Sequence, residues 1–421
     1  MARWFGRVAL TLAAGILATH SAGAAQRKPL PPQQIEQLFK ENRHSLRLSD
    51  GLLSGPGADL LLQGAAGTQF FVLGEQHNAR EIPEFTSALF RQLNRLHGYR
   101  HLALEQDPVA TARASAAPLR GRLDGIASFA RRYPAAFTFR TDQELTMIAE
   151  AGRIHKLERP VWGLDQVFGA THVVDRLVEI APDPRTRART AGLAEEVRRI
   201  ENELLARKSR FMTPDTQKTP EFLALPNFYR RTPGSEADLL ISQLFKSIDI
   251  YRDWSLAAQH GQFTRHRQNV AREENMKHLF MSNYAAVQGA GEKLPKVLLK
   301  FGHAHSIRGS NRWGILTLGN FASEFATSNG LGSFHLAIYA NNDQPGYYDI
   351  LSTDPDYGAL MRSASPGEWA VIDLRPLRAR AFQGAIPGMT EEQRSLIFGF
   401  DAVLLIGSQA VGSYDLTGRP Q

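Results

Sequence analysis

The chain has 421 residues, with 49 Lys and Arg against 42 Asp and Glu, which gives a formal net charge of +7 at neutral pH. A content of 43% hydrophobic and 22% charged residues is that of a globular protein able to bury a large core. The sequence contains no cysteine, which excludes disulfides, thiolate metal sites, iron–sulfur clusters and cysteine nucleophiles.

The first 24 residues predict a cleavable signal peptide. Arg3 and Arg7 give a positive start, Val8 to Ala18 is an apolar run, and Ala22 to Ala24 offers the small residues that precede cleavage. The apolar run is shorter than the roughly 20 residues that span a bilayer. We therefore expect a secreted or periplasmic protein, cleaved near Ala24, whose mature chain has no integral membrane segment.

Strand-length apolar runs alternate with helix-period stretches after residue 68. This alternation predicts an α/β fold with a mostly parallel sheet flanked by helices. The expected strands are 69–73, 101–104, 160–164, 296–300, 314–318, 334–339, 369–374 and 402–406. Residues 25–68 are interpreted as an N-terminal extension, 69–410 as the α/β domain and 411–421 as a C-terminal tail.

The helix expected after the first strand shows the clearest periodicity. Its apolar positions are Ile82, Phe85, Leu89, Leu93 and Leu96. Spacings of three and four residues place these side chains on one helical face, and Gly98 is expected to end the helix.

Residues from about 172 to 286 have a helical pattern throughout and are interpreted as a large helical insertion. Arginines concentrate between Arg185 and Arg210, but four glutamates are interspersed with them. Such mixed charge is typical of a solvated helix with i,i+4 ion pairs, so we expect no nucleic-acid partner.

The four clearest strands each end in side chains suited to acid–base or metal chemistry. These side chains are Glu75, His77, Glu105, Asp165, His303 and His305. Active sites of parallel α/β proteins collect at the carboxyl edge of the strands, so the six residues are expected to converge on one rim.

The spacing of these residues carries further information. Glu75 and His77 are two positions apart, as are His303 and His305, and in an extended backbone each pair projects to one side. Gly302 permits close approach to the backbone. Two such pairs facing one another are able to activate a water directly or to hold a cation. The sequence contains no G-x-S-x-G, P-loop, G-x-G-x-x-G or H-E-x-x-H motif, which disfavours serine-hydrolase chemistry and nucleotide binding.

At these positions the sequence resembles the erythromycin esterase-like group and the related ChaN-like haem-binding and Tiki/TraB protease-like proteins. The matching segments are Phe71–His77, Leu102–Glu105, Trp162–Asp165, Arg272–Met276, Leu298–His305 and Phe400–Leu405. The resemblance implies an α/β fold with an acidic, histidine-rich cleft, which in esterase members activates water to hydrolyse a cyclic ester. It also implies that Arg272 lies on a helix, where it orients a carboxylate or binds an anionic intermediate of the substrate.

The leading hypothesis is a hydrolase that cleaves an ester, lactone or amide in a small-molecule or peptide-like substrate. His77, oriented by Glu75 or Glu105, would deprotonate water, and His303 or His305 would stabilise the oxyanion or protonate the leaving group. Asp165 completes the candidate catalytic set.

Two other readings stay open. In a metal-assisted variant, a divalent cation such as Zn²⁺ or Mn²⁺ is held by Glu75, His77, His303 and His305. In the alternative from another class, the same rim binds haem or another ligand without turnover.

Overall fold

The computed structural model describes residues 33–418 except 155, 156, 158, 208–219, 230, 231, 261, 341–353, 366 and 408–410, and no side chain is described for 253–265 or 340. The signal peptide expected at residues 1–24 lies outside the described residues. Within the described part, no helix is both long enough and apolar enough to cross a membrane.

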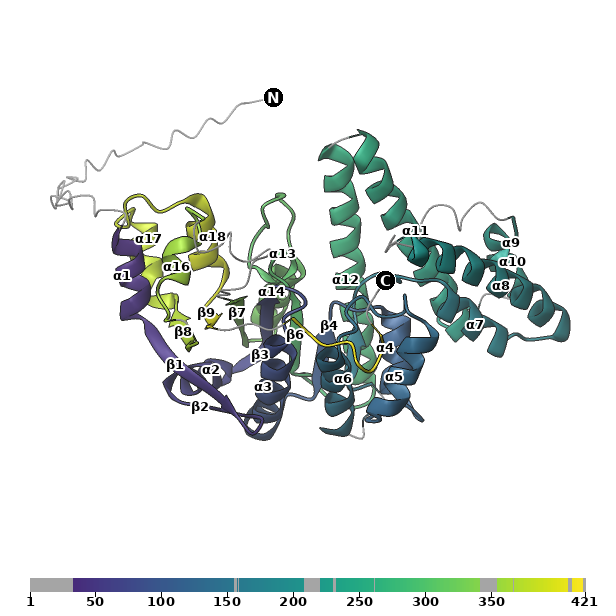
Figure 1. Ribbon diagram of the computed structural model, residues 1–421, viewed down its shortest axis with the longest axis horizontal. Coiled ribbons are helices and arrows are strands. Elements are labelled where there is room, and N and C mark those ends of the chain that lie inside the picture. The colour runs from purple at the N-terminus through teal and green to yellow at the C-terminus, as the bar shows by residue number, and fades with distance from the viewer. Residues whose placement is uncertain are drawn as a thin grey trace, which may run out of the picture.

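A mixed sheet forms the centre of the molecule (Figure 1). Its strands within the described residues are β1 (Arg43–Ser49), β2 (Leu52–Ser54), β3 (Thr68–Glu75), β4 (His101–Leu104), β5 (Val161–Gly163), β6 (Val297–Gly302), β7 (Gly332–Ala340), β8 (Trp369–Asp373) and β9 (Ala402–Ile406). The strand order is β2-β1-β8-β9-β7-β3-β6-β4-β5. The block from β9 to β5 is parallel, and β2, β1 and β8 add an antiparallel edge. The predicted α/β fold with a mostly parallel sheet is confirmed.

Helices cover both faces of this sheet and extend beyond it. They are α1 (Gln33–Glu41), α2 (Pro56–Ala65), α3 (Glu81–His97), α4 (Pro108–Ser115), α5 (Leu123–Arg132), α6 (Asp142–Ile154), α7 (Thr171–Glu179), α8 (Pro184–Ala206), α9 (Pro220–Leu223), α10 (Leu225–Phe228), α11 (Glu236–His260), α12 (Gln262–Gly289), α13 (His303–Ser306), α14 (Leu318–Ser328), α16 (Gly358–Met361), η2 (Arg375–Leu377), α17 (Arg378–Phe382) and α18 (Glu391–Gly399).

Alternate residues of β3 face two separate cores. Phe71 and Leu73 pack in the cluster that includes α2, α3 and α6, whereas Phe70 and Val72 pack against α12 and α14. This alternation is the period-two geometry of a strand covered on both faces. The sheet is thereby fixed between two helical layers, and the carboxyl ends of its strands are left to carry the site.

The expected apolar face of α3 is almost entirely correct. Ile82, Phe85, Leu89 and Leu93 are fully buried, but Leu96 in the last turn is 51% exposed. Gly98 ends the helix with φ of 74°, a left-handed conformation that glycine adopts without steric cost.

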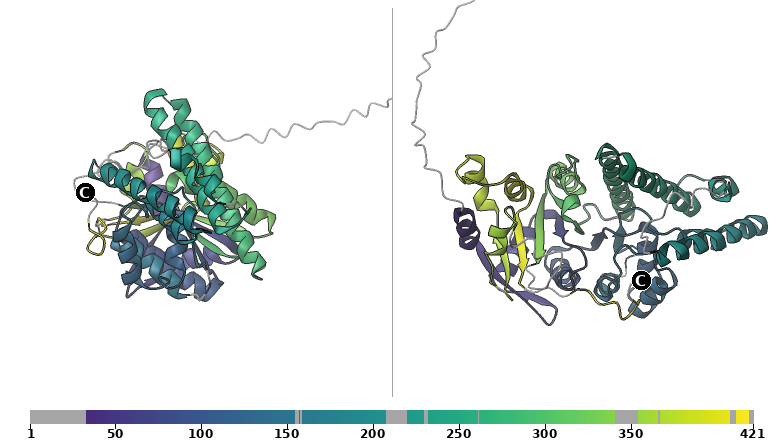
Figure 2. Two further views of the ribbon diagram at one scale, coloured as in Figure 1. Left: turned by 90° about the vertical axis from the view of Figure 1, so that its right-hand side faces the viewer. Right: turned by 45° about the horizontal axis from the view of Figure 1, so that its top comes forward.

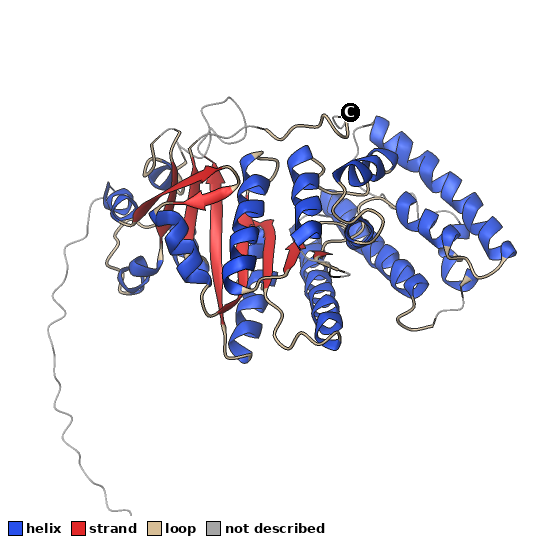
Figure 3. Ribbon diagram, turned by 90° about the horizontal axis from the view of Figure 1, so that it is seen from below, coloured by secondary structure: helices blue, strands red, loops and turns tan. Residues whose placement is uncertain are grey.

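The helical insertion follows β5, the last strand of the sheet order, and projects away from the sheet (Figure 1 and Figure 2). Figure 3 shows the strands gathered in one half of the molecule and the all-helical insertion in the other. Helices α7 to α11 share their own buried cluster, which includes Val173, Leu193, Phe222 and Leu244. By contrast, α12 returns to the sheet, where Phe280 packs against strand residues.

Two segments differ from their expected structure. The run at 314–318 is not a strand: Leu316 makes an isolated bridge with Ser310, and Thr317 caps α14 by accepting a hydrogen bond from the Asn320 backbone. A capping threonine favours a helix start over a continued strand. Residues 43–54, expected within an N-terminal extension, form β1 and β2, and β1 pairs directly with β8 in the sheet.

Candidate active site

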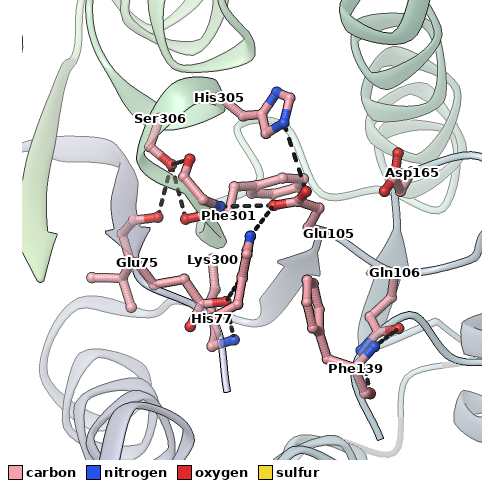
Figure 4. A network of polar contacts seen from close by, with 12 residues as sticks. Glu75, His77, Glu105, Gln106, Phe139, Asp165, Lys300, Phe301, His305 and Ser306 are labelled. Carbon is pink, nitrogen blue, oxygen red and sulfur yellow. Dashed lines mark hydrogen bonds and ion pairs between the residues drawn. The ribbon is translucent and has the colours of Figure 1, made fainter. Parts of the chain in front are cut away.

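The expected residues lie at the carboxyl ends of adjacent parallel strands. Glu75 is the last residue of β3 and pairs in register with Gly302, the last residue of β6. Glu105 directly follows β4, and Asp165 lies two positions beyond β5. Figure 4 shows Glu105 between His77 and His305, with a contact to each. Four strand ends far apart in the chain therefore meet at one rim.

His77 lies in the turn after β3 and faces two carboxylates. Its Nδ1 is 3.1 Å from Glu75 Oε1, and its Nε2 is 3.7 Å from Glu105 Oε2. The ring stacks on Phe139 with centroids 4.2 Å apart. The side chain of His77 is 32% exposed, whereas those of Glu75 and Glu105 are almost completely buried. His77 is thus a solvent-accessible imidazole held by buried acids.

A buried lysine lies beneath this imidazole. Lys300 Nζ is 2.7 Å from Glu75 Oε1 and 2.6 Å from Glu144 Oε1, and all three side chains are buried. Lys300 sits on β6 and Glu144 on α6, so this ion pair network joins the sheet to the helix that covers it. The ammonium group supports the ionised form of Glu75, which orients His77.

Arg272 on α12 binds the acids on the other side of the site. Its Nη2 lies 2.6 Å from Glu105 Oε1 and 2.6 Å from Asp165 Oδ2, and its Nε donates to Asp165 Oδ1 at 2.9 Å. Its Nη1 is 3.0 Å from His305 Nε2. Each guanidinium nitrogen therefore contacts a protein acceptor. These contacts show Arg272 in one of the two roles that the resemblance implied, the orientation of carboxylates, and its binding of substrate stays a prediction.

His305 is fixed by a second buried acid. Its Nδ1 is 2.6 Å from Glu273 Oε1, and the other Glu273 oxygen accepts from the Leu318 backbone N–H at 2.8 Å. Because Arg272 can only donate, the neutral His305 ring has its proton on Nδ1 and its lone pair on Nε2. The ring is thus held at both nitrogens by protein groups.

His303 does not join this polar network. Glycine 302 is the N-cap of α13, so residues 303–306 turn into a short helix instead of continuing extended. The His303 ring stacks on Tyr339 with centroids 4.3 Å apart and lies edge-on to Phe400. Its buried Nε2 has no hydrogen-bond partner in the part of the chain that the structure describes. The expectation that His303 and His305 project to the same side is therefore wrong.

Gly302 allows His77 to approach β6 closely. A Cβ built at this position would lie 2.9 Å from His77 Nε2 and 3.4 Å from Glu105 Oε2. The Gly302 N–H also donates to Glu105 Oε2 at 2.7 Å. Close approach, rather than an unusual backbone conformation, is what this glycine supplies, because its φ is −59°.

The surroundings of the groups shift their pKa values in opposite directions. Burial lowers the pKa of His77, but the nearby carboxylates of Glu105 and Glu75 outweigh it and raise that pKa above its ordinary value. Burial alone would raise the pKa of Glu105, yet His305, His77 and Arg272 hold it well below its usual range. Burial lowers the pKa of His303 to about 3. The carboxylates thus favour the protonated form of His77, whereas burial favours the neutral form of His303.

The proposed metal ligands do not fit a cation. Among the described residues, no three His, Asp or Glu side chains are arranged to hold a metal ion. The physical reason is that Lys300 already lies on Glu75, while the His303 ring points among aromatic side chains. The ligand set Glu75, His77, His303 and His305 is corrected accordingly.

Haem ligation needs an imidazole that an added ligand can reach. The His303 ring packs against Tyr339 with its Nε2 buried, and His305 Nε2 accepts from Arg272. The side chain of His77 is 32% exposed, whereas that of His305 is 6% exposed.

Four contributing residues escaped the sequence reasoning: Phe139, Glu144, Glu273 and Lys300. Lys300 offered a signal, because a lysine inside the apolar strand of residues 297–302 must have a buried acidic partner. Glu273 lies within the segment that resembles the esterase-like group. Phe139 and Glu144 come from the loop before α6 and from α6 itself, and nothing in their local pattern indicates proximity to His77.

Comparison with known proteins identifies the fold. No protein family model and no curated protein sequence matches this chain. A protein from Bacillus cereus matches with a TM-score of 0.53 and 15% identity over 93% of this chain and 100% of its own. A mutant erythromycin esterase, EreC, in its open conformation matches with a TM-score of 0.54 and 13% identity, over 88% of this chain and 98% of its own. A succinoglycan biosynthesis protein matches with a TM-score of 0.53 and 15% identity, over 91% of this chain and 98% of its own. The chain therefore has the α/β fold that erythromycin esterase also has.

Proposed function

We propose that the protein is a hydrolase in which His77 activates water to cleave an ester, lactone or amide bond. The observation that carries this proposal is the environment of His77. Its imidazole is accessible on one side and is held by Glu75 at Nδ1, with Nε2 turned toward Glu105. An oriented imidazole next to a carboxylate is the arrangement that general-base catalysis requires.

The orientation of His77 defines its proposed role. Because Nδ1–H donates to the Glu75 carboxylate, the lone pair of the neutral ring is on Nε2. Nε2 takes a proton from a water as the water oxygen attacks the carbonyl carbon. The resulting imidazolium is stabilised by Glu75 and Glu105 and then returns the proton to the leaving oxygen or nitrogen.

The remaining groups position this acid–base pair. Arg272 fixes Glu105 and Asp165, and His305 with Glu273 fixes Arg272 from behind. Asp165 is accordingly a positioning residue in this proposal. We assign the same role to Lys300, which holds Glu75.

The direct test is turnover of a small ester and a lactone by the purified mature protein, measured for the wild type and His77→Ala. We expect the substitution to lower kcat by about 10²–10⁴-fold, the typical contribution of a general base. His278→Ala, at an exposed position on α12, is the matched control and should hydrolyse like the wild type. Equal turnover by wild type and His77→Ala would refute the role of His77.

The alternative reading, haem or ligand binding without turnover, predicts a different result in the same samples. Added haem would then give a Soret band that disappears in His77→Ala, and no ester would be hydrolysed. A hydrolase gives turnover and no such band.

We also propose that the protein is exported to the periplasm or secreted, because residues 1–24 have the pattern of a signal peptide. Mass spectrometry of the protein isolated from its native host should find a mature chain that begins near Ala25. A mature chain that still contains residues 1–24 would contradict this proposal.

A further inference from the structure

The C-terminal strap, residues 411–418, runs beside the turn that carries His77. Val411 forms an antiparallel bridge with Ala79, and the Gly412 N–H donates to the Asn78 carbonyl at 3.1 Å. These are the two residues that follow His77. Asn78 has φ of 71°, a left-handed conformation that asparagine adopts more readily than most other residues. The strap adds two backbone contacts to this turn.

The same strap is bound to the start of α6. The Asp142 N–H donates to the Ser413 carbonyl at 2.9 Å. The Asp142 carboxylate accepts from Ser413 Oγ at 2.7 Å, from the Asp415 N–H at 2.8 Å and from the Leu416 N–H at 3.0 Å. The Gln143 side chain accepts from the Ser413 N–H at 3.1 Å. A buried carboxylate that accepts three hydrogen bonds from one segment fixes that segment firmly.

The segment just before α6 packs against the His77 ring. Phe139 stacks on the imidazole with an angle of 23° between the ring planes. Gln106, the residue after Glu105, holds the Phe139 backbone by donating from Nε2 to its carbonyl at 2.7 Å. The His77 ring thus lies between its own turn and the Phe139 segment. The strap is hydrogen-bonded on both sides of this ring.

We propose that residues 411–418 position the His77 imidazole by joining the turn after β3 to the segment that presents Phe139. The catalytic consequence of the strap rests on the proposed function, whereas its effect on the imidazole does not. A displacement of about 1 Å in a catalytic group is enough to lower a rate about 100-fold.

Gly412→Ala tests the proposal in the full chain. A Cβ at this position would lie 2.5 Å from Thr141 Cγ2, so the strap must move away from the segment before α6. We expect the rate of His77 modification by diethyl pyrocarbonate, followed by mass spectrometry, to rise severalfold relative to exposed His278. Histidine NMR should show the pKa of His77 falling toward its ordinary value. On an ester substrate, kcat should fall about 10–100-fold while KM changes less. Gly192→Ala, with open space around the added methyl, is the matched control.

Asp142→Ala is a second, independent disruption. It removes the carboxylate that accepts from the strap, and Thr141 remains to cap α6 through its contact with the Glu144 N–H. We expect the same changes at His77, and melting curves establish that each variant is folded. The proposal is overturned if both variants are folded but His77 keeps its wild-type reactivity and pKa. If the wild type hydrolyses no ester, the proposed function fails, and the modification and NMR measurements still decide whether the strap positions His77.

Discussion

The turns after β3 and β6 begin with similar sequences and reach different geometries. Glu75 still belongs to the strand, and His77 returns to contact it at 3.1 Å. After β6, residues 303–306 form a helical turn. Positions two apart share a face in a strand but point nearly opposite ways in a helix, because a helix has 3.6 residues per turn. A spacing of two residues thus predicts convergence only where the backbone stays extended.

The two turns also differ in how they shift the pKa of a histidine. Carboxylates around His77 raise its pKa. His303 instead packs against an aromatic ring, and burial lowers its pKa to about 3. The carboxylates favour the protonated form of one imidazole, and the other remains an uncharged packing group. Four substitutions, at Lys300, Gly302, His303 and Glu75, test this contrast.

The largest expected effect comes from the lysine that β6 supplies to the first turn. Lys300→Met leaves Glu75 and Glu144 buried together without a cation. Breaking a buried ion pair costs about 3–5 kcal/mol, and we expect a loss of that size in the free energy of unfolding by denaturant. Lys293→Met, at an exposed position, is the control. A loss below about 1 kcal/mol would show that the network is not a stabilising support for the His77 turn.

Gly302→Ala tests the closeness of the two turns. The added Cβ would lie 2.9 Å from His77 Nε2, so the imidazole must move. We expect kcat/KM for an ester to fall about 10–100-fold with little change in melting temperature. Gly289→Ala, which has no atom within contact distance of the new methyl, should retain wild-type activity. Activity within twofold of the wild type for Gly302→Ala would place the reacting group elsewhere.

His303 should make the fold sensitive to acid. Its pKa of about 3 in the folded protein lies below the value of about 6.5 in the unfolded chain, so the unfolded state binds the proton first. Its stabilising contribution is therefore present above about pH 6.5 and is lost as the pH falls toward 3. His303→Phe should flatten the pH dependence of the unfolding free energy by up to about 1.4 kcal/mol per pH unit between pH 6 and 4. Denaturant titrations with His278→Gln as control measure this difference. An unchanged slope would show that His303 is already charged in the folded protein.

The smallest expected effect is a shift in the pH profile of hydrolysis. The general base must be neutral, so activity should rise with pH through the elevated pKa of His77. Glu75→Gln removes one carboxylate that raises this pKa, and the acid limb of kcat/KM should move down by about 1 pH unit. Glu84→Gln, at a side chain on α3 that is 41% exposed, should leave the limb in place. If Glu75→Gln does so too, His77 does not set the profile.

The sequence predicted which strand ends form the site better than it predicted the side-chain contacts within it. Apolar runs with acidic or imidazole ends placed Glu75, Glu105 and Asp165 at the correct edge, because strand direction follows from the βαβ pattern. The helical turn at His303 could not be predicted from a four-residue motif. The support of His77 by Phe139 and the C-terminal strap also could not, because tertiary packing alone brings them together. Leu316 shows the same limit, since the cap formed by Thr317 overrides the strand-like run around it.

Helix α12 connects the helical lobe formed by α7 to α11 with the candidate active site. Helices α7 to α11 pack around a buried cluster of their own. Many residues of this lobe can therefore be changed without altering the packing of the sheet. Helix α12 also carries Arg272 and Glu273, which hold Glu105 and His305. An insertion or deletion before residue 272 that shifts α12 would displace Arg272 and Glu273 from the groups that they bind. Natural or designed changes in the length of the lobe must therefore preserve the position and rotation of α12 relative to the site.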